Sequence, residues 1–448
     1  MTFNEFKQLV VAQCEAQGIT EYELYYQTGE STSVGAFQHE INEFSSSRTG
    51  GVCFRCIVNG KMGYASTEAL NAEQAKDVVL KAADNASVLE AEEEVFLGEG
   101  GQTYQEVNRV AYDRPSTEEL ISTVLATQEK LYAADPRAID GCQTQGFSEY
   151  EEIAICNSRG LDLQWKGNSA GLFVAGVVSD GQEMSNDFKV KLGKLDEIDT
   201  DAMTKETIES AISKMGGEPA PTGQYPVIFN PDAMSSLLQC FSSVFSSEAS
   251  QKGLSRFDKS EGEMVASEAV TLVDDPFHPE SPLPINFDAE GSPTFTKNVI
   301  ENGKLNTLLY NLKTAAVAGK KTTGNASKAG YDASVGLRPF TMYLANGPLT
   351  EDELLQKAGN GVYINSLEGL HAGANPVSGD FSLQSAGYMI EDGKKTTHVK
   401  AFTVAGNFYD LLKNITALAN NCQLPMAMGM TAFGAPSTLV EGLSVAGK

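Results

Sequence analysis

The chain has 448 residues, of which 41% are hydrophobic and 21% charged, a balance typical of folded globular proteins. Its formal net charge of −26 would repel a phosphate backbone and argues against direct binding to DNA or RNA. No stretch is apolar over the roughly 18 residues that a membrane helix needs, and the start, MTFNEFKQLVVAQCEAQ, lacks the pattern of a secretory signal, so we expect a cytoplasmic protein of two or three domains.

Residues 1–95 are predicted to form an α+β domain. Apolar residues at helical spacing predict an amphipathic helix over 2–17 and a second helix over 68–90. Strands are expected in YELYYQTG, STSVGAFQHEI, GVCFRCIV and KMGYAS, the last two joined by a hairpin turn at Asn59-Gly60. The acidic stretch EAEEEVFLGEGG that follows is typical of a linker or surface loop.

A central unit is predicted over residues 110–217. Ser116 and Glu119 fit a helix capping box, and a further helix is expected over 201–215. Between them, EEIAICN, LDLQWKG and AGLFVAGVVS have the composition of strands. The stretch GGEPAPTGQYP at 216–226 is the clearest boundary, because its prolines and glycines can sustain neither a helix nor a central strand.

Residues 224–448 are predicted to form a C-terminal domain. Asn230 is the expected N-cap of a helix whose apolar spacing continues to Phe245. Strands and hairpins follow, with turns at Asn302-Gly303 and Asp392-Gly393, and the last expected helix is NFYDLLKNITALANN. The mixture of helices and hairpin-linked strands predicts an α+β fold class.

The residues with chemical potential do not combine into a catalytic set. His39 and Glu40 begin a zinc-protease pattern, but the matching later position is Glu43 and the segment is predicted to be a strand. Cys53 and Cys56 form a lone CxxC on a predicted strand, where positions three apart point to opposite faces, so we expect buried core cysteines. The seven cysteines are odd in number and widely spaced, which fits a reducing compartment without a disulfide framework.

The glycine-containing stretch AGKKTTGNASKAGYDASVG, residues 318–336, lacks the pattern of a phosphate-binding loop. A flexible loop is expected there, although long loops of this kind are often functional. No G-x-S-x-G elbow is present, so no catalytic serine can be assigned.

Four segments in the expected order resemble the TldD/PmbA family, whose members were formerly labelled modulators of DNA gyrase. They are EYELYYQTGESTSVGAFQHEINEFSSSRTGGVCFRCIVNGKMGYAST, EMVASEAVTLVDDP with INFDAEGSPTFTKNVIENGKLNTLLYN, TTGNASKAGYDASVGLRPFTMYLANG, and NPVSGDFSLQSAGYMIEDGK with FTVAGNFYDLLKNI. The resemblance implies an N-terminal α+β domain with a mixed sheet, a largely antiparallel C-terminal β domain with a few helices, dimers, and a role in proteolysis or peptide processing.

The resemblance also implies where a zinc site would lie. In TldD an HExxxH motif precedes the VASxxVTxxDD pattern, and matching the preceding leucines to Leu237-Leu238 places the motif on residues 239–244. Gln239, Cys240 and Val244 then replace the first His, the Glu and the second His. These residues do not make a zinc site with a base for its water, and residues 225–277 contain no His, so this chain is placed with PmbA (TldE), which lacks the motif.

Four further residues are candidates through the resemblance. His371 lies just before GANPVSGDF, where TldD-like chains carry a further metal ligand, although a structural or surface role suits a single His better. Asn325, Asn375 and Asp380 are candidate substrate-binding residues.

Three functions follow, and the sequence leaves all three open. The chain is expected to be a non-catalytic subunit that carries no cofactor, with zinc in a TldD-like partner and an unfolded peptide as substrate. It could instead be a peptidase as a homodimer with an atypical site, or a regulatory binding protein without proteolytic activity.

Overall fold

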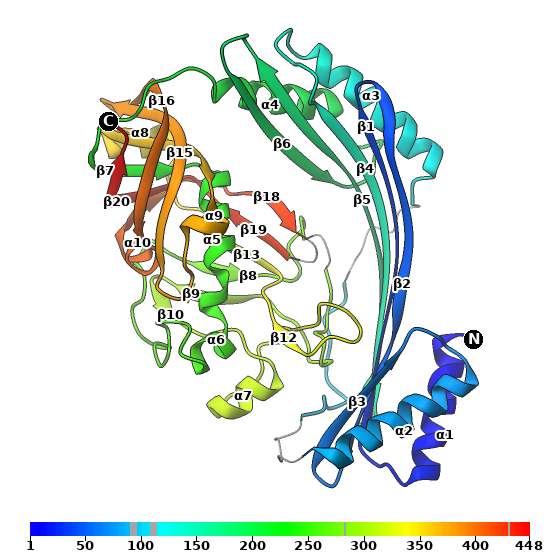
Figure 1. Ribbon diagram of the computed structural model, residues 1–448. Coiled ribbons are helices and arrows are strands. Elements are labelled where there is room, and N and C mark those ends of the chain that lie inside the picture. The colour runs from blue at the N-terminus through cyan, green and yellow to red at the C-terminus, as the bar shows by residue number, and fades with distance from the viewer. Residues whose placement is uncertain (90–95, 108–113, 282–283, 429–430) are drawn as a thin grey trace.

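The structure, a computed structural model, describes residues 1–89, 96–107, 114–281, 284–428 and 431–448. A long curved sheet forms one side of the molecule, and a compact β-rich body packs against it (Figure 1). The expected α+β class is confirmed, with three six-stranded sheets and one two-stranded sheet in the described part of the chain. Residues 90–95, the core of the expected acidic linker, lie outside the described residues.

The long sheet has the strand order β3-β2-β1-β4-β5-β6. Its strands are β1 (Tyr22–Phe37), β2 (Glu40–Val58), β3 (Lys61–Thr67), β4 (Gln143–Asn157), β5 (Asp162–Ser179) and β6 (Met184–Leu192). Every pairing in it is antiparallel, so the expectation of a mixed N-terminal sheet is wrong in this detail. The sheet continues from β1 to β4, and strands of the first and central units therefore share one set of hydrogen bonds.

Four helices cover the outer face of this sheet at its two ends (Figure 1). Helices α1 (Phe3–Gln17) and α2 (Ala72–Val88) pack at the lower end, and α3 (Thr117–Ala133) and α4 (Thr200–Ser213) pack at the upper end. Alternation along the strand separates the two faces: Leu24 packs with the core under α1 and α2, whereas Tyr25 packs with the C-terminal body. The inner face of the long sheet is thus available to the other body.

The C-terminal body contains the other two large sheets and the small hairpin of β11 (Ala326–Ser327) and β12 (Gly336–Leu337). One large sheet comprises β8 (Leu272–Asp274), β9 (Lys297–Glu301), β10 (Lys304–Leu305), β13 (Thr341–Leu344), β18 (Gln423–Met428) and β19 (Thr431–Ala435). The other comprises β7 (Gly223–Phe229), β14 (Gly361–Glu368), β15 (Asp380–Glu391), β16 (Lys394–Asn407), β17 (Ile415–Leu418) and β20 (Thr438–Ala446). Most pairs are antiparallel, as expected, but β13–β19 and β14–β7 are parallel.

Helix α5 (Pro231–Phe241) connects these two sheets, since it contacts β18 and β19 of one and β14 and β7 of the other. Asn230 caps it through a 2.8 Å bond from the Ala233 amide, as the sequence predicts. Its apolar face, including Leu237 and Phe241, is fully buried in the largest core cluster. The helix is shorter than the sequence predicts. It ends at Phe241, and the chain continues as a 3₁₀ turn over Ser242–Phe245. The remaining short helices are α6 (Ser247–Gln251), α7 (Leu312–Ala318), α8 (Glu351–Ala358), α9 (Leu370–Gly373) and α10 (Phe408–Asn414).

Several secondary-structure predictions are wrong, among them the separation of LDLQWKG from AGLFVAGVVS, since β5 runs through both. The first two expected strands form the single strand β1, and the turn falls at Gln38 and His39, which both have left-handed backbone angles. His39 therefore lies in a hairpin turn and not in a strand. The last expected helix ends at Asn414, and β17 begins at Ile415, because pairing with β20 buries this β-branched residue.

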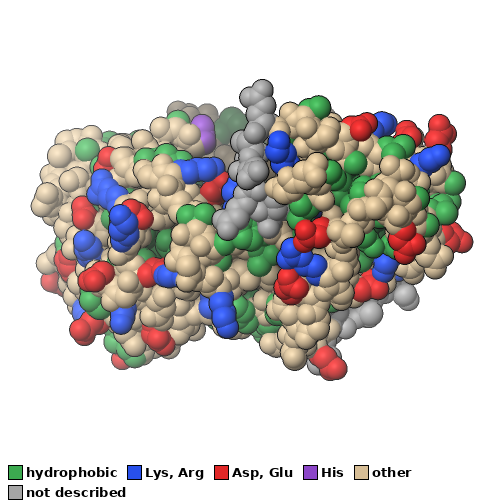
Figure 2. All heavy atoms as spheres, turned by 90° about the horizontal axis from the view of Figure 1, so that it is seen from below, with side chains coloured by type: hydrophobic (Ala, Val, Ile, Leu, Met, Phe, Trp, Pro, Cys, Tyr) green, Lys and Arg blue, Asp and Glu red, His purple; other side chains and the backbone are tan. Residues whose placement is uncertain are grey.

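Three local sequence expectations are confirmed, namely a helix cap, a hairpin turn and the burial of two cysteines. The capping box at Ser116 and Glu119 forms, and Asn59-Gly60 makes the tight turn from β2 to β3. Cys53 and Cys56 are both buried, and all seven cysteines are free. Within the described residues, no helix is both long enough and apolar enough to cross a membrane. On the face drawn in Figure 2, basic side chains are scattered among acidic ones and do not gather in one patch.

Truncation of the apolar face of α5 should destabilise the fold strongly. Leu237 is 0% exposed, so Leu237→Ala is expected to lower the free energy of unfolding by about 3 kcal/mol through lost burial and a cavity. Leu254, which is 45% exposed, is the matched control. Leu254→Ala should change the free energy of unfolding by less than about 0.5 kcal/mol. Urea denaturation measures both, and equal losses would contradict the assignment of α5 to the core.

Candidate functional site

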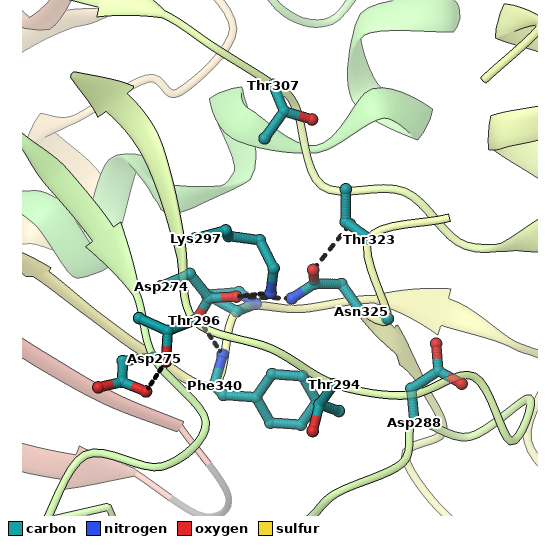
Figure 3. Close-up of polar contacts among 12 residues, drawn as sticks. Asp274, Asp275, Asp288, Thr294, Thr296, Lys297, Thr307, Thr323, Asn325 and Phe340 are labelled. Atoms are coloured by element: carbon teal, nitrogen blue, oxygen red, sulfur yellow. Dashed lines mark hydrogen bonds and ion pairs between the residues drawn. The ribbon is translucent and has the colours of Figure 1, made fainter. Parts of the chain in front are cut away.

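A buried polar network surrounds Asp274 at the end of β8 (Figure 3). The Asp274 carboxylate accepts hydrogen bonds from Lys297 Nζ at 3.1 Å, Asn325 Nδ2 at 2.8 Å and the Phe340 backbone amide at 2.7 Å. Asp274 is 0% exposed and Lys297 is 7% exposed. A buried charge is costly unless it is paired and hydrogen-bonded. These contacts therefore allow the Asp274 carboxylate to be buried at the end of β8.

Asn325 is fully buried within this network and does not line an open surface. Its Oδ1 accepts from Thr323 Oγ1 at 2.8 Å, and its Nδ2 also donates to the Arg338 carbonyl oxygen at 3.0 Å. Both ends of the amide are thereby used to hold the loop 318–336 against β8. This loop, which was expected to be flexible, contains the β11–β12 pairing and is held to Asp274 by Asn325.

The other candidate residues lie elsewhere, around the end of α5. Cys240 is half-buried, and its Sγ lies 4.0 Å from the carbonyl oxygen of Leu370 in α9. His371 is the next residue and is exposed. The structure therefore brings the expected motif region of α5 and the His371 segment side by side, although they are about 130 positions apart.

Asn375 and Asp380 shape the turn that leads from α9 into β15. Asn375 Oδ1 accepts the backbone amide of Val377 at 3.0 Å, which orders the turn. Asp380 is exposed and accepts from Asn407 Nδ2 at 2.8 Å. That hydrogen bond, together with one from Ser378 and the nearby positive charge of Arg256, holds the pKa of Asp380 below its usual range. Asp380 is thus a solvent-facing carboxylate at the start of β15.

The three residues at the expected motif positions do not fit a zinc site. Gln239 and Cys240 are half-exposed on α5, and burial raises the pKa of the Cys240 thiol, which opposes the thiolate that zinc needs. Val244 is 1% exposed and packs in the core from the 3₁₀ turn. Within the described residues, no group of three or more His, Cys, Asp or Glu side chains is arranged to hold a metal ion.

Sequence reasoning did not find Asp274 and Lys297 as partners. The pair Asp274-Asp275 directly after an apolar strand is a visible signal, because acidic residues are rarely placed at a buried strand end. The cation, however, comes from β9, and the amides come from two further segments, so spacing along the chain does not reveal the network.

Comparison with known families accounts for nearly the whole chain. Residues 22–86 match the PmbA/TldA metallopeptidase domain 1, residues 111–215 the central domain, and residues 222–447 the C-terminal domain. The chain belongs to the PmbA/TldD family. The resemblance seen in the sequence is therefore confirmed.

Individual relatives agree with the family assignment. A metalloprotease of Methanothermobacter thermautotrophicus is 26% identical over 410 residues, which are 89% of this chain and 87% of that protein. The structure of a Thermotoga maritima protein, described as a proposed modulator of a DNA gyrase, superposes with a TM-score of 0.89 at 31% identity and covers 99% of this chain and 100% of that one. TldE of Thermococcus kodakarensis shares the fold, with a TM-score of 0.87, 24% identity and coverage of 98% and 99%.

Loss of the cation in the Asp274 network should be costly. Lys297→Met leaves the Asp274 carboxylate buried without its ion pair, and we expect a loss of about 3–5 kcal/mol in unfolding free energy. Lys81→Met, which removes an exposed ion pair with Asp77, should cost less than about 0.5 kcal/mol. Chemical denaturation compares the two, and a loss below about 1 kcal/mol for Lys297→Met would show that the network is not a structural requirement.

Proposed function

We propose that this chain is a non-catalytic, cytoplasmic subunit of a PmbA/TldD-type peptidase, with zinc carried by a TldD-like partner. The observation that carries the proposal is the side-chain set at the end of α5, where Gln239, Cys240 and Val244 occupy the positions of the expected motif. A zinc peptidase needs imidazole, thiolate or carboxylate ligands and a base to activate water. No step of zinc chemistry is assigned to this chain.

The packing of Val244, at the position that the resemblance assigns to the second His, also supports the proposal. The chain leaves α-helical geometry at Ser242, and the following 3₁₀ turn directs Val244 into the core, where it is 1% exposed. A metal ligand at this position would have to leave that core. A shift of one residue in the matching does not help, because Phe245 is also 0% exposed and is stacked on Phe257 at 5.5 Å.

A partner could pair with the long sheet at β2. Strand β3 pairs only with residues 52–58 of β2, so along residues 40–51 the outer edge has no strand neighbour among the described residues. Unpaired backbone groups of an edge strand form hydrogen bonds with another chain. Phe44 is 57% exposed on this segment, which adds apolar area to such a contact. We infer a dimer, with a TldD-like subunit or a second copy, in which an unfolded peptide is enclosed.

A second candidate function is peptide cleavage by this chain alone with an atypical site. The contact between Cys240 and the carbonyl oxygen of Leu370 favours it, because it brings a thiol near the residue that precedes His371. The third possibility, a regulatory binding protein without proteolytic activity, is consistent with the description of the Thermotoga maritima relative. Measurements of metal content and of peptide cleavage distinguish these three candidate functions.

The purified chain should contain no stoichiometric zinc and should not cleave an unstructured peptide, because it supplies no complete ligand set. Addition of an HExxxH-bearing relative should give both zinc and cleavage. Elemental mass spectrometry and a peptide assay measure these outcomes. Zinc that is retained by the chain alone and lost in His371→Ala, but not in the control His278→Ala, would establish the atypical-site peptidase instead. Failure of every HExxxH-bearing relative to bind the chain would favour the regulatory protein.

A charge placed on the β2 edge should weaken association. Lysine on an edge strand opposes pairing with another strand, so Ser46→Lys is expected to shift the assembly toward monomer. Ser122→Lys, on the exposed face of α3, adds the same charge away from the edge and should have no effect. Light scattering after gel filtration measures the mass. Unchanged association of Ser46→Lys, with normal circular dichroism, would exclude β2 as the contact.

A further inference from the structure

The long sheet and the C-terminal body meet in a buried contact at the lower end of the sheet, which we call the seam. An apolar cluster forms its centre: Tyr25, Ile153, Ile155, Leu161, Trp165, Ile285, Phe287 and Phe340. Hydrogen bonds cross it from Trp165 Nε1 to the Pro284 carbonyl oxygen at 3.0 Å and from Tyr104 Oη to the Gly291 carbonyl oxygen at 2.8 Å. Another runs from Asn286 Nδ2 to the Gln105 carbonyl oxygen at 2.9 Å. The segment 285–293 therefore fixes the C-terminal body to the sheet.

Four ionisable side chains are buried next to this cluster. Glu23 and Arg55 come from β1 and β2 and form an ion pair, with Arg55 Nε 2.8 Å from Glu23 Oε1. Asp288 and Glu290 come from the C-terminal segment, and each is 3% exposed. The sheet thus contributes a neutral pair, whereas the C-terminal body contributes two carboxyl groups.

The two carboxyl groups are held mainly by backbone amides. Asp288 accepts from the amides of Glu290 and Ser292 at 2.9 Å each and from that of Ala326 at 3.0 Å. Glu290 Oε2 accepts from the amide of Leu312 at 2.8 Å. Amides stabilise a carboxylate but bring no full positive charge. Whether both carboxyl groups can be ionised therefore depends on the charges around Asp288 and Glu290.

Those surrounding charges do not neutralise two carboxylates. Lys297 faces Asp288 but is already paired with Asp274. Arg55 faces Glu290 but is already paired with Glu23, which also faces Glu290 and repels it. Tyr25 and Tyr104 face Asp288 as neutral phenols. Lys328, whose Nζ lies 4.6 Å from the centre of the Tyr25 ring, adds one cation at the edge of the seam.

Burial and mutual repulsion favour retention of a proton by this pair. Loss of solvent, followed by the charge of Asp288, raises the pKa of Glu290 to about 8. Loss of solvent also raises the pKa of Asp288 to about 6, against the three amide hydrogen bonds. Both shifts act in the direction that burial predicts for carboxyl groups.

We propose that the seam is a proton-controlled contact, which is closed while Asp288 and Glu290 together retain a proton and loosens when both are ionised. In the open state water solvates the two groups, so they hold the proton less tightly than in the closed state. The preference for the closed state is therefore greatest below about pH 4, the ordinary range of these carboxyl groups, and it is lost progressively as the pH rises to about 8.

The seam is not closely packed throughout. A cavity of about 20 Å³, room for a single water molecule, remains between the two bodies and is lined by Gln27, Lys328 and Arg338 among others. The buried Gln27 Oε1 accepts no hydrogen bond among the described residues, although Gln27 Nε2 donates to Glu151 at 2.6 Å. An unsatisfied buried acceptor regains hydrogen bonds to water on opening, which lowers the cost of that motion.

Trp165 reports this motion without a label, because it is the single tryptophan of the chain and is 6% exposed at the seam. As the pH rises from about 5 to about 9, we expect its emission to shift to longer wavelength and its quenching by acrylamide to increase, because closure loses stability between the ordinary and the raised pKa values of the two carboxyl groups. The midpoint should lie below about pH 8, because closure loses no further free energy above the pKa of Glu290 in the closed state, while far-UV circular dichroism stays constant.

Two variants test whether the Asp288–Glu290 pair causes the fluorescence transition. Glu290→Gln can still accept the Leu312 amide but cannot ionise, so the transition should disappear or move. Glu118→Gln removes an exposed carboxylate from α3 and should behave like the unmodified protein. Quenching of the unmodified protein that does not change with pH would overturn the proposal even without the variants. An unchanged transition in Glu290→Gln, or loss of circular dichroism in step with the quenching, would also overturn it.

Discussion

The packing of the C-terminal body depends on the hydrogen bonds and the ion pair of the buried Asp274 carboxylate. This carboxylate ends β8 inside the protein, and it is tolerated because one cation and two N–H donors from three other segments converge on it. Those donors fix β9, the loop 318–336 and the start of β13 at once. Since the same loop carries Lys328 to the sheet, the network that orders the C-terminal body also positions the seam between the two bodies.

The parts of the fold that the sequence predicts well are those with local causes. The Asn230 cap, the capping box at Ser116 and the turn at Asn59-Gly60 depend on residues within four positions of one another, and all three form. The lone CxxC was interpreted correctly for the same reason, because alternation along one strand is enough to place its two cysteines on opposite faces.

The wrong secondary-structure predictions result from contacts between segments that are far apart in the sequence. Strand β1 continues through Gly29 because β2 and β4 pair with it on both sides, which outweighs the weak strand preference of glycine. Ile415 leaves the helical pattern because β20 offers it a buried pairing position. The candidate site divides in the same way: Asn325 belongs to a network gathered from distant segments, whereas His371, Asn375 and Asp380 remain together on one short stretch of chain.

The end of α5 shows what apolar burial contributes where the two sheets of the C-terminal body meet. Metal ligands are polar groups that a core tolerates only while they are coordinated or hydrogen-bonded. At position 244 this chain has a valine that contributes apolar burial, and Leu237, Phe241 and Phe245 continue the same core. An apolar residue at this position stabilises the helix and its sheets, whereas a polar one would need a hydrogen-bond partner in the core. The long sheet and the seam do not depend on a ligand at this position, since neither includes residue 244.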